Sequence, residues 1–149
     1  MEYSLNGKWK LRCVETGEIF PARVPGDITA DCYAAGRIPD PYFGMNYKDE
    51  RFLLERDYEY SLEFTARKPK EGERCILAFG GIDSFAELRL NGELLGETEN
   101  MFLRYEYDVT QLLKKDNLLC VHMRSTLKCM KEIDAEKYFA CFNKERIFL

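Results

Sequence analysis

Histidine, the side chain best suited to both acid–base catalysis and metal binding near neutral pH, is nearly absent from this chain. The chain contains a single histidine, His122, which lies between Val121 and Met123 in an apolar, strand-like run. A metal site needs further ligands beside an imidazole, and acid–base catalysis needs a partner that positions the ring. The sequence identifies neither. We therefore expect His122 to be a structural residue, and we assign no catalytic residue, metal ligand or cofactor to the chain.

The six cysteines are the other chemically versatile group. None of them has the Cys-x-x-Cys spacing of a zinc ribbon or a thioredoxin-like redox site. Cys13, Cys75 and Cys120 lie in alternating apolar runs, where a free thiol behaves as a small hydrophobic side chain. The first residues lack the basic stretch followed by an apolar one that marks a secretory signal. We expect reduced, structural cysteines and a cytoplasmic protein.

Charge and composition exclude several functional classes. The 149 residues include 22 basic and 26 acidic side chains, a net charge of −4, whereas nucleic-acid-binding domains usually carry a basic excess. The hydrophobic content of 46% is sufficient for a packed core and argues against disorder. The longest apolar runs, 75–79 and 138–142, are far shorter than the about 20 residues that span a membrane. We expect one globular domain with neither a nucleic-acid nor a membrane partner.

Short runs of alternating apolar and polar residues fill most of the chain, as in β-strands with one buried face. The run 57–64 is the clearest, and Asn91-Gly92 between two apolar runs predicts a tight hairpin. Residues 74–79 are more continuously apolar, which predicts a strand covered on both faces. About seven strands are expected in the first 125 residues. The main runs are 8–14, 19–24, 57–64, 74–79, 85–90, 103–109 and 118–123.

Turns and short helices, rather than regular crossover helices, separate these strands. Asp27 is a candidate N-cap for a short helix over 28–35, which Gly36 ends. A proline-rich loop over 38–46 follows. This arrangement predicts an all-β fold, an antiparallel β-sandwich with short helices in its connections. From Lys128 onward the residues fit no strand pattern, so we expect a helical or irregular excursion whose mixed charges form a solvated surface.

Five stretches of the chain, in their order and spacing, resemble the N-terminal domain of family 2 glycoside hydrolases, closest to the β-mannosidase branch. A single stretch such as Leu-Asn-Gly is weakly specific, whereas the five in order are strongly specific. The Pro-Gly-Asp and Pro-Asp-Pro-Tyr loops point to the mannosidase branch rather than to galactosidases or glucuronidases. The five stretches are residues 5–11, 22–27, 36–46, 80–92 and 100–102.

This resemblance implies a jelly-roll, galactose-binding-like domain over residues 1–126, packed beside a catalytic (β/α)₈ barrel of the same polypeptide. Residues 127–149 are then an excursion of that domain, incomplete at its C-terminus. Retaining hydrolysis of a β-linked sugar needs two carboxyl groups about 5–5.5 Å apart. The family carries both on the barrel, the acid/base directly after an asparagine. This sequence has no Asn-Glu dipeptide and is shorter than the about 250 residues of a barrel. We expect the chain alone to be inactive.

The resemblance also implies that the 38–46 loop lies near the mouth of the barrel. There the amide of Asn46, the carboxylate of Asp40 and the ring of Tyr42 are candidates to contact a sugar. Each has a structural alternative. Asn46 can cap a short helix that runs through Leu54, Asp40 can bind the backbone of its own turn, and Tyr42 and its neighbour Phe43 can anchor the loop.

Asn100, Met101 and Phe102 are candidates for the face that meets the barrel. The alternative is that Phe102 fills the core of the jelly roll, because aromatic side chains dominate both cores and interfaces.

Two functions follow from these observations. The first is a non-catalytic domain of a β-mannosidase-like glycosidase in carbohydrate metabolism, which supports the barrel, helps to complete its sugar pocket and contacts a β-linked sugar only in the full enzyme. The second is a free-standing carbohydrate-binding module or lectin, because jelly rolls also form lectins and a fold alone does not determine function.

Overall fold

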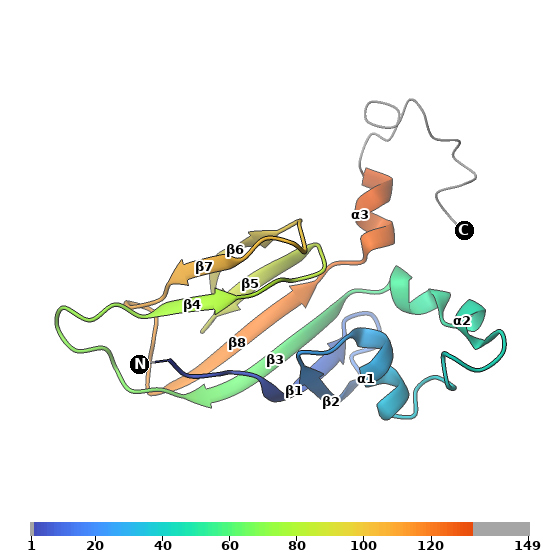
Figure 1. The fold of residues 1–149 in the computed structure, drawn as a ribbon, viewed down its shortest axis with the longest axis horizontal. Helices are drawn as coiled ribbons and strands as arrows, with labels where there is room; N and C mark the ends of the chain where they lie inside the picture. Colours follow the sequence, from blue (N-terminus) through green and yellow to red (C-terminus); the bar gives the residue numbers. More distant parts are fainter. Residues whose placement is uncertain (1, 133–149) are drawn as a thin grey trace.

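A computed structural model describes residues 2–132 as two antiparallel sheets (Figure 1). The larger sheet has six strands in the order β2-β1-β3-β8-β5-β6, and the smaller pairs β4 with β7. The strands are β1 (Gly7–Cys13), β2 (Ile19–Val24), β3 (Tyr58–Thr65), β4 (Ile76–Phe79), β5 (Ala86–Leu90), β6 (Glu93–Thr98), β7 (Tyr105–Asp108) and β8 (Asp116–Met123). The predicted antiparallel β-sandwich is confirmed.

Short helices connect the strands, as predicted. They are α1 (Ile28–Ala34), α2 (Asn46–Asp49), the 3₁₀ helix η1 (Arg51–Glu55) and α3 (Thr126–Glu132). Helix α3 begins the segment that we expected as an excursion from residue 127, and the rest of that segment lies outside the described residues.

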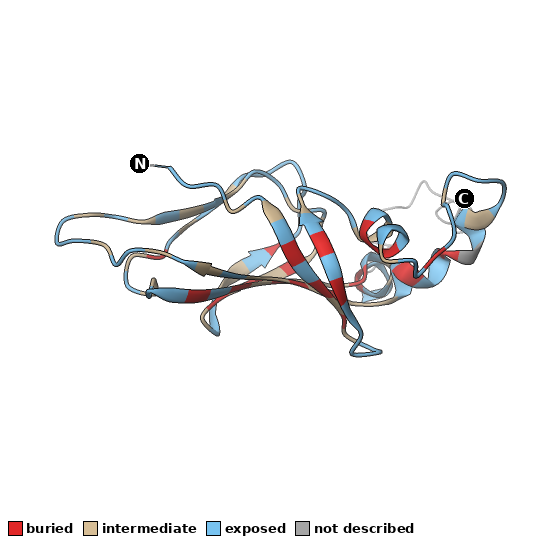
Figure 2. Cartoon of the chain, turned by 90° about the horizontal axis from the view of Figure 1, so that it is seen from below, coloured by how far each residue is buried: buried red, intermediate tan, exposed pale blue. Residues whose placement is uncertain are grey.

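The core lies on one face of the six-stranded sheet. Leu11 pairs with Tyr60, Tyr60 with Val121, and Val121 with Leu88, so four neighbouring strands place buried side chains in one row. Figure 2 shows buried positions alternating with more exposed ones along these strands. The alternation that predicted the strands therefore also identified their buried face.

The opposite face carries charged side chains in the same register. Arg12 pairs with Glu59 in an ion pair of 3.1 Å, and His122 lies in register between Glu59 and Glu87 on the next strands. The described residues contain no group of three or more histidine, cysteine, aspartate or glutamate side chains arranged to hold a metal ion. His122 is thus a half-buried member of a charged sheet face.

The Asn91-Gly92 hairpin is confirmed. Asn91 has a φ of 54° and Gly92 a φ of 90°, the left-handed conformations that a two-residue turn between twisted strands requires. The Asn91 side chain also joins the hairpin to its neighbours. Its Nδ2 donates to the Leu112 carbonyl at 2.9 Å, and its Oδ1 accepts from the Leu118 amide at 2.9 Å.

The prediction that the strand within 74–79 is covered on both faces was wrong. Ile76 and Ala78 are exposed, while Leu77 and Phe79 face the core. The apolar run is continuous, but β4 belongs to a two-stranded sheet with only its inner face against the larger one. On that inner face the Phe79 ring meets the Tyr107 ring edge-on at 6.4 Å.

Helix α1 is fixed to the sheet by a buried carboxylate that the sequence did not reveal. Its predicted cap is confirmed, since Asp27 accepts a hydrogen bond from the Ala30 amide at 2.8 Å. Asp31, one turn later, is buried. Its Oδ2 accepts from the Tyr60 hydroxyl at 2.9 Å and its Oδ1 from the Arg23 amide at 3.0 Å. Burial raises the pKa of Asp31, and the hydrogen bond from Tyr60 opposes that rise.

Replacing Tyr60 by phenylalanine tests this connection. Without the hydroxyl, the buried Asp31 carboxylate loses a partner, and we expect the free energy of unfolding to fall by about 1–3 kcal/mol at pH 7. The hydrogen bond favours the ionised carboxylate, so the loss should shrink as pH falls through the raised pKa of Asp31. Tyr33→Phe, at an exposed position of the same helix, should change stability by less than about 0.5 kcal/mol. Urea unfolding measures both, and equal effects would contradict the assignment.

Candidate functional site

Exposed apolar side chains gather at one end of the sandwich. In Figure 1, α2 and α3 lie at this end, and η1 contacts both helices. We define the apolar end as residues 40–55, residues 99–104 and α3. Its exposed apolar side chains are Tyr42, Phe43, Met45, Tyr47, Phe52, Leu54, Met101, Phe102, Leu103 and Met130.

Side-chain hydrogen bonds give the loop before α2 a defined shape. Asp40 Oδ1 accepts from the Tyr42 amide at 2.9 Å, so the turn role of Asp40 is observed. Asn46 Nδ2 donates to the Asp40 carbonyl at 2.8 Å and closes the loop. The expected capping role of Asn46 was wrong, because Met45 occupies the N-cap position of α2 and the Asn46 side chain is used across the loop instead.

The two aromatic side chains of this loop point away from the fold. Tyr42 has 96% and Phe43 74% of its surface exposed, so neither anchors the loop. Buried Ile38 provides an apolar anchor at the start of the loop instead. Two exposed aromatic rings on a hydrogen-bonded loop form a surface suited to stacking on another molecule.

The turn between β6 and β7 presents a further exposed aromatic ring, that of Phe102. Asn100 Oδ1 accepts from the Phe102 amide at 2.9 Å, and the Tyr105 hydroxyl donates to the Asn100 carbonyl at 3.0 Å. A Cβ on Gly81 would lie 2.7 Å from the Met101 carbonyl oxygen, so glycine is needed for this close approach. Phe102 has 86% of its surface exposed, so the alternative that it fills the core of the jelly roll is wrong.

A cavity of about 380 Å³ lies between this turn and α3. Leu103 and Tyr105 line one side of the cavity and Cys129 of α3 lines another. Phe85, which directly precedes β5, also lines it. Its polar groups are mainly acidic. Among residues 2–132 a single basic residue, Arg124, lines it, and this forms an ion pair of 3.0 Å with Glu132. Carboxylates in such a cavity can accept hydrogen bonds from hydroxyl groups.

Helix α3 is held at the apolar end by charges that the sequence suggested were merely solvated. Lys128 Nζ lies 2.5 Å from Glu15 Oε1 and 3.2 Å from Asp57 Oδ1. Ser125 Oγ donates to the Leu54 carbonyl at 2.6 Å, which attaches the start of α3 to η1. Partial burial opposes ionisation of Glu15, but the hydrogen bonds from Lys128 and the Asp57 amide lower its pKa overall.

The six sequence-predicted residues thus fall into two groups. Asp40, Tyr42 and Asn46 share one loop, whereas Asn100, Met101 and Phe102 share the β6–β7 turn. Both groups belong to the apolar end. Within residues 2–132, no helix is long and apolar enough to cross a membrane.

Comparison with known proteins gives consistent matches. Residues 9–148 match the family described as glycosyl hydrolase 2 galactose-binding domain-like. A β-mannosidase of Rattus norvegicus is 34% identical over 127 residues, which are 85% of this chain and 14% of that protein. β-Mannosidase B of Aspergillus terreus is 38% identical over 95 residues, 64% of this chain and 11% of that protein. The chain therefore spans about one seventh of the length of the first curated relatives it matches.

A solved structure agrees with these matches. The crystal structure of β-D-mannosidase from Dictyoglomus thermophilum superposes with a TM-score of 0.82 at 36% sequence identity. The superposition covers 89% of this chain and 17% of that chain.

Replacing Lys128 by methionine tests the attachment of α3. The change keeps the aliphatic stem and removes the charge that Glu15 and Asp57 share, so α3 amides should exchange faster with solvent. The free energy of unfolding should fall by about 0.5–1.5 kcal/mol, since the pairs are partly exposed. Hydrogen exchange followed by mass spectrometry measures this effect.

A matched control and a pH series complete the test. Lys131→Met, in the last turn of the same helix, should leave α3 exchange unchanged. In the unmodified chain the attachment should weaken as pH falls from about 4.5 through the lowered pKa of Glu15, because protonation removes its charge. Hydrogen exchange in α3 that changes neither with Lys128→Met nor with the fall in pH would contradict the attachment of α3 through Lys128.

Proposed function

The chain belongs to the glycosyl hydrolase 2 galactose-binding domain-like family, and from this premise we propose that it is a non-catalytic supporting domain of a β-mannosidase-like retaining glycoside hydrolase. Residues 1–126 are its jelly-roll domain, and residues 127–149 are an excursion of the same domain. Its role in carbohydrate metabolism is to support a catalytic barrel of the same polypeptide and to help complete the sugar pocket of that barrel. A reducing compartment such as the cytoplasm suits the five free cysteines of the described chain.

The observation that carries this proposal is the apolar end. A large exposed apolar patch costs free energy in water, and such patches usually mark an interaction surface. Here the backbone that carries Tyr42 and Phe102 is held by hydrogen bonds, so the exposed rings are presented in fixed positions. The matched β-mannosidases extend well beyond the region that aligns with this chain. We assign the apolar end to contact with the barrel, with Asn100, Met101 and Phe102 in that interface.

The loop before α2 is the part of this surface suited to sugar. The Tyr42 ring is almost fully exposed and can stack on the apolar face of a β-linked sugar. Within the loop Asp40 uses Oδ1 and Asn46 uses Nδ2, which leaves Asp40 Oδ2 and Asn46 Oδ1 to accept from a hydroxyl group. These contacts form only when the loop faces the barrel, where we place both catalytic carboxyl groups.

A chimera tests the barrel interface. The matching N-terminal segment of the Dictyoglomus thermophilum β-mannosidase is replaced by this chain, and release of nitrophenol from a nitrophenyl β-mannoside is measured. We expect an active chimera, and we expect Phe102→Ser to lower its activity at least several-fold because the exposed ring loses its contact with the barrel. The same substitution should change the stability of the isolated chain by less than about 0.5 kcal/mol.

Leu118→Ser is the matched control, because Leu118 is also an exposed apolar residue but projects from β8 away from the apolar end. It should leave the activity of the chimera unchanged. An equal loss of chimera activity with both substitutions, or no loss of activity with Phe102→Ser, would contradict the assignment of Phe102 to the barrel interface.

Isothermal titration of the isolated chain with mannose and manno-oligosaccharides separates the two functions. A supporting domain should bind these sugars weakly or not at all, because the barrel supplies most of the pocket. A free-standing lectin should bind them measurably, and Tyr42→Ala should then abolish the binding. Saturable binding at micromolar sugar would overturn the supporting role.

A further inference from the structure

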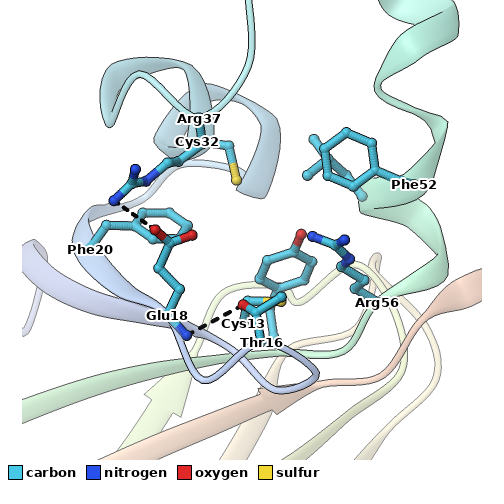
Figure 3. Close-up of a pocket in the computed structure, with 10 residues that line it drawn as sticks. Cys13, Thr16, Glu18, Phe20, Cys32, Arg37, Phe52 and Arg56 are labelled. Atoms are coloured by element: carbon cyan, nitrogen blue, oxygen red, sulfur yellow. Dashed lines mark hydrogen bonds and ion pairs between the residues drawn. The ribbon is translucent and has the colours of Figure 1, made fainter.

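A second cavity, of about 220 Å³, lies between α1, the β1–β2 turn and η1 (Figure 3). Phe20 and Leu53 supply apolar walls. In Figure 3 the Cys32 sulfur and the Arg56 guanidinium point into the space between α1 and η1. The volume is well above the roughly 10–15 Å³ that a single water molecule needs, so the cavity can admit a small organic molecule.

Tyr58 is the most deeply buried polar side chain of this cavity. Only 2% of its surface is exposed, and no residue within 2–132 forms a hydrogen bond with its hydroxyl group. Burial raises the pKa of Tyr58 above its ordinary value, so the hydroxyl group keeps its proton and remains a donor. A hydroxyl group that has no partner in the described chain is free to donate a hydrogen bond to a ligand in the cavity.

Arg56 supplies a positive charge beside this hydroxyl group. Its guanidinium lies 4.7 Å from the centre of the Phe52 ring, and no carboxylate of the described chain forms an ion pair with it. The other arginine of the cavity is different, since Arg37 is neutralised by Glu18 at 2.7 Å. Burial raises the pKa of the Cys32 thiol to about 11, so this thiol adds no negative charge at neutral pH. The cavity therefore has one uncompensated positive charge.

We propose that this cavity binds a small organic carboxylate. One carboxylate oxygen accepts from the Arg56 guanidinium and the other from the Tyr58 hydroxyl group, while the organic body packs on Phe20 and Leu53. A single negative charge balances the cavity, and the apolar walls favour a carboxylate with a hydrocarbon body over a bare phosphate ion. Arg56 and Tyr58, the two donors, lie outside the residues assigned to the barrel and the sugar, whereas Leu53 belongs to both the cavity and the apolar end.

Titration of the isotope-labelled full chain with benzoate, followed by NMR, tests the site. We expect saturable shifts of the amides of Cys32, Arg56 and Tyr58. Benzamide has the same shape without the charge and should bind at least about tenfold more weakly. Arg56→Gln and Tyr58→Phe should each weaken benzoate binding by about tenfold or more, since each removes a donor to the charged ligand.

The control variant is Arg74→Gln, which removes an arginine paired with Asp108 outside the cavity and should leave benzoate affinity unchanged. If Arg56→Gln fails to fold, Tyr58→Phe and the benzamide comparison still decide the matter. Absence of saturable shifts, equal binding of benzamide, or unchanged affinity in the folded variants would overturn the proposal. Tighter binding of inorganic phosphate than of benzoate would also overturn it.

Discussion

The antiparallel pairing of β3 with β8 determines where the rest of the structure lies. The two strands pair along their whole length, from Tyr58 opposite Met123 to Thr65 opposite Asp116. The two strands run in opposite directions, so the start of β3 lies beside the end of β8. As a result η1, which precedes β3, and α3, which follows β8, lie at the same end of the sheet. The start of β5 and the end of β6 lie at this end of the sheet too, since Ala86 pairs with both Met123 and Thr98. One register thus assembles the apolar end from segments far apart in the sequence.

The polar and apolar parts of this end have different tasks. Hydrogen bonds of Asp40, Asn46 and Asn100 are made within their own loops, and Lys128 connects α3 to the β1–β2 turn. These bonds shape the backbone and leave the neighbouring aromatic rings without contacts in the core. A surface that is held in shape and still exposes Tyr42 and Phe102 resembles one side of an interface more than a poorly packed core.

Sequence patterns predicted the features that depend on local spacing. Alternation identified the buried face that contains Leu11, Asn91-Gly92 predicted its hairpin, and Asp27 predicted the start of α1. Features that depend on distant partners were missed. Asp31 is one charged residue in a short helix until its partner Tyr60, 29 residues later, is placed beside it.

The same limit explains the errors at the candidate site. The sequence shows that residues 100–102 form a turn with an aromatic ring, but a ring serves equally well in a core or an interface. Only the fold shows that Phe102 lies outside. Likewise, Asn46 has the residue type and position of a helix cap, and its use by the Asp40 carbonyl depends on the path of the intervening loop.

We propose that a catalytic domain of the same polypeptide covers the apolar end. Carbene footprinting of the isolated chain and of the Dictyoglomus thermophilum chimera, compared residue by residue, measures this coverage directly. The account predicts that labelling of residues 42–54 and 101–103 falls sharply in the chimera, while labelling of exposed Ile19 and Leu118 does not change. Equal labelling of residues 42–54 and 101–103 in the two proteins would contradict it.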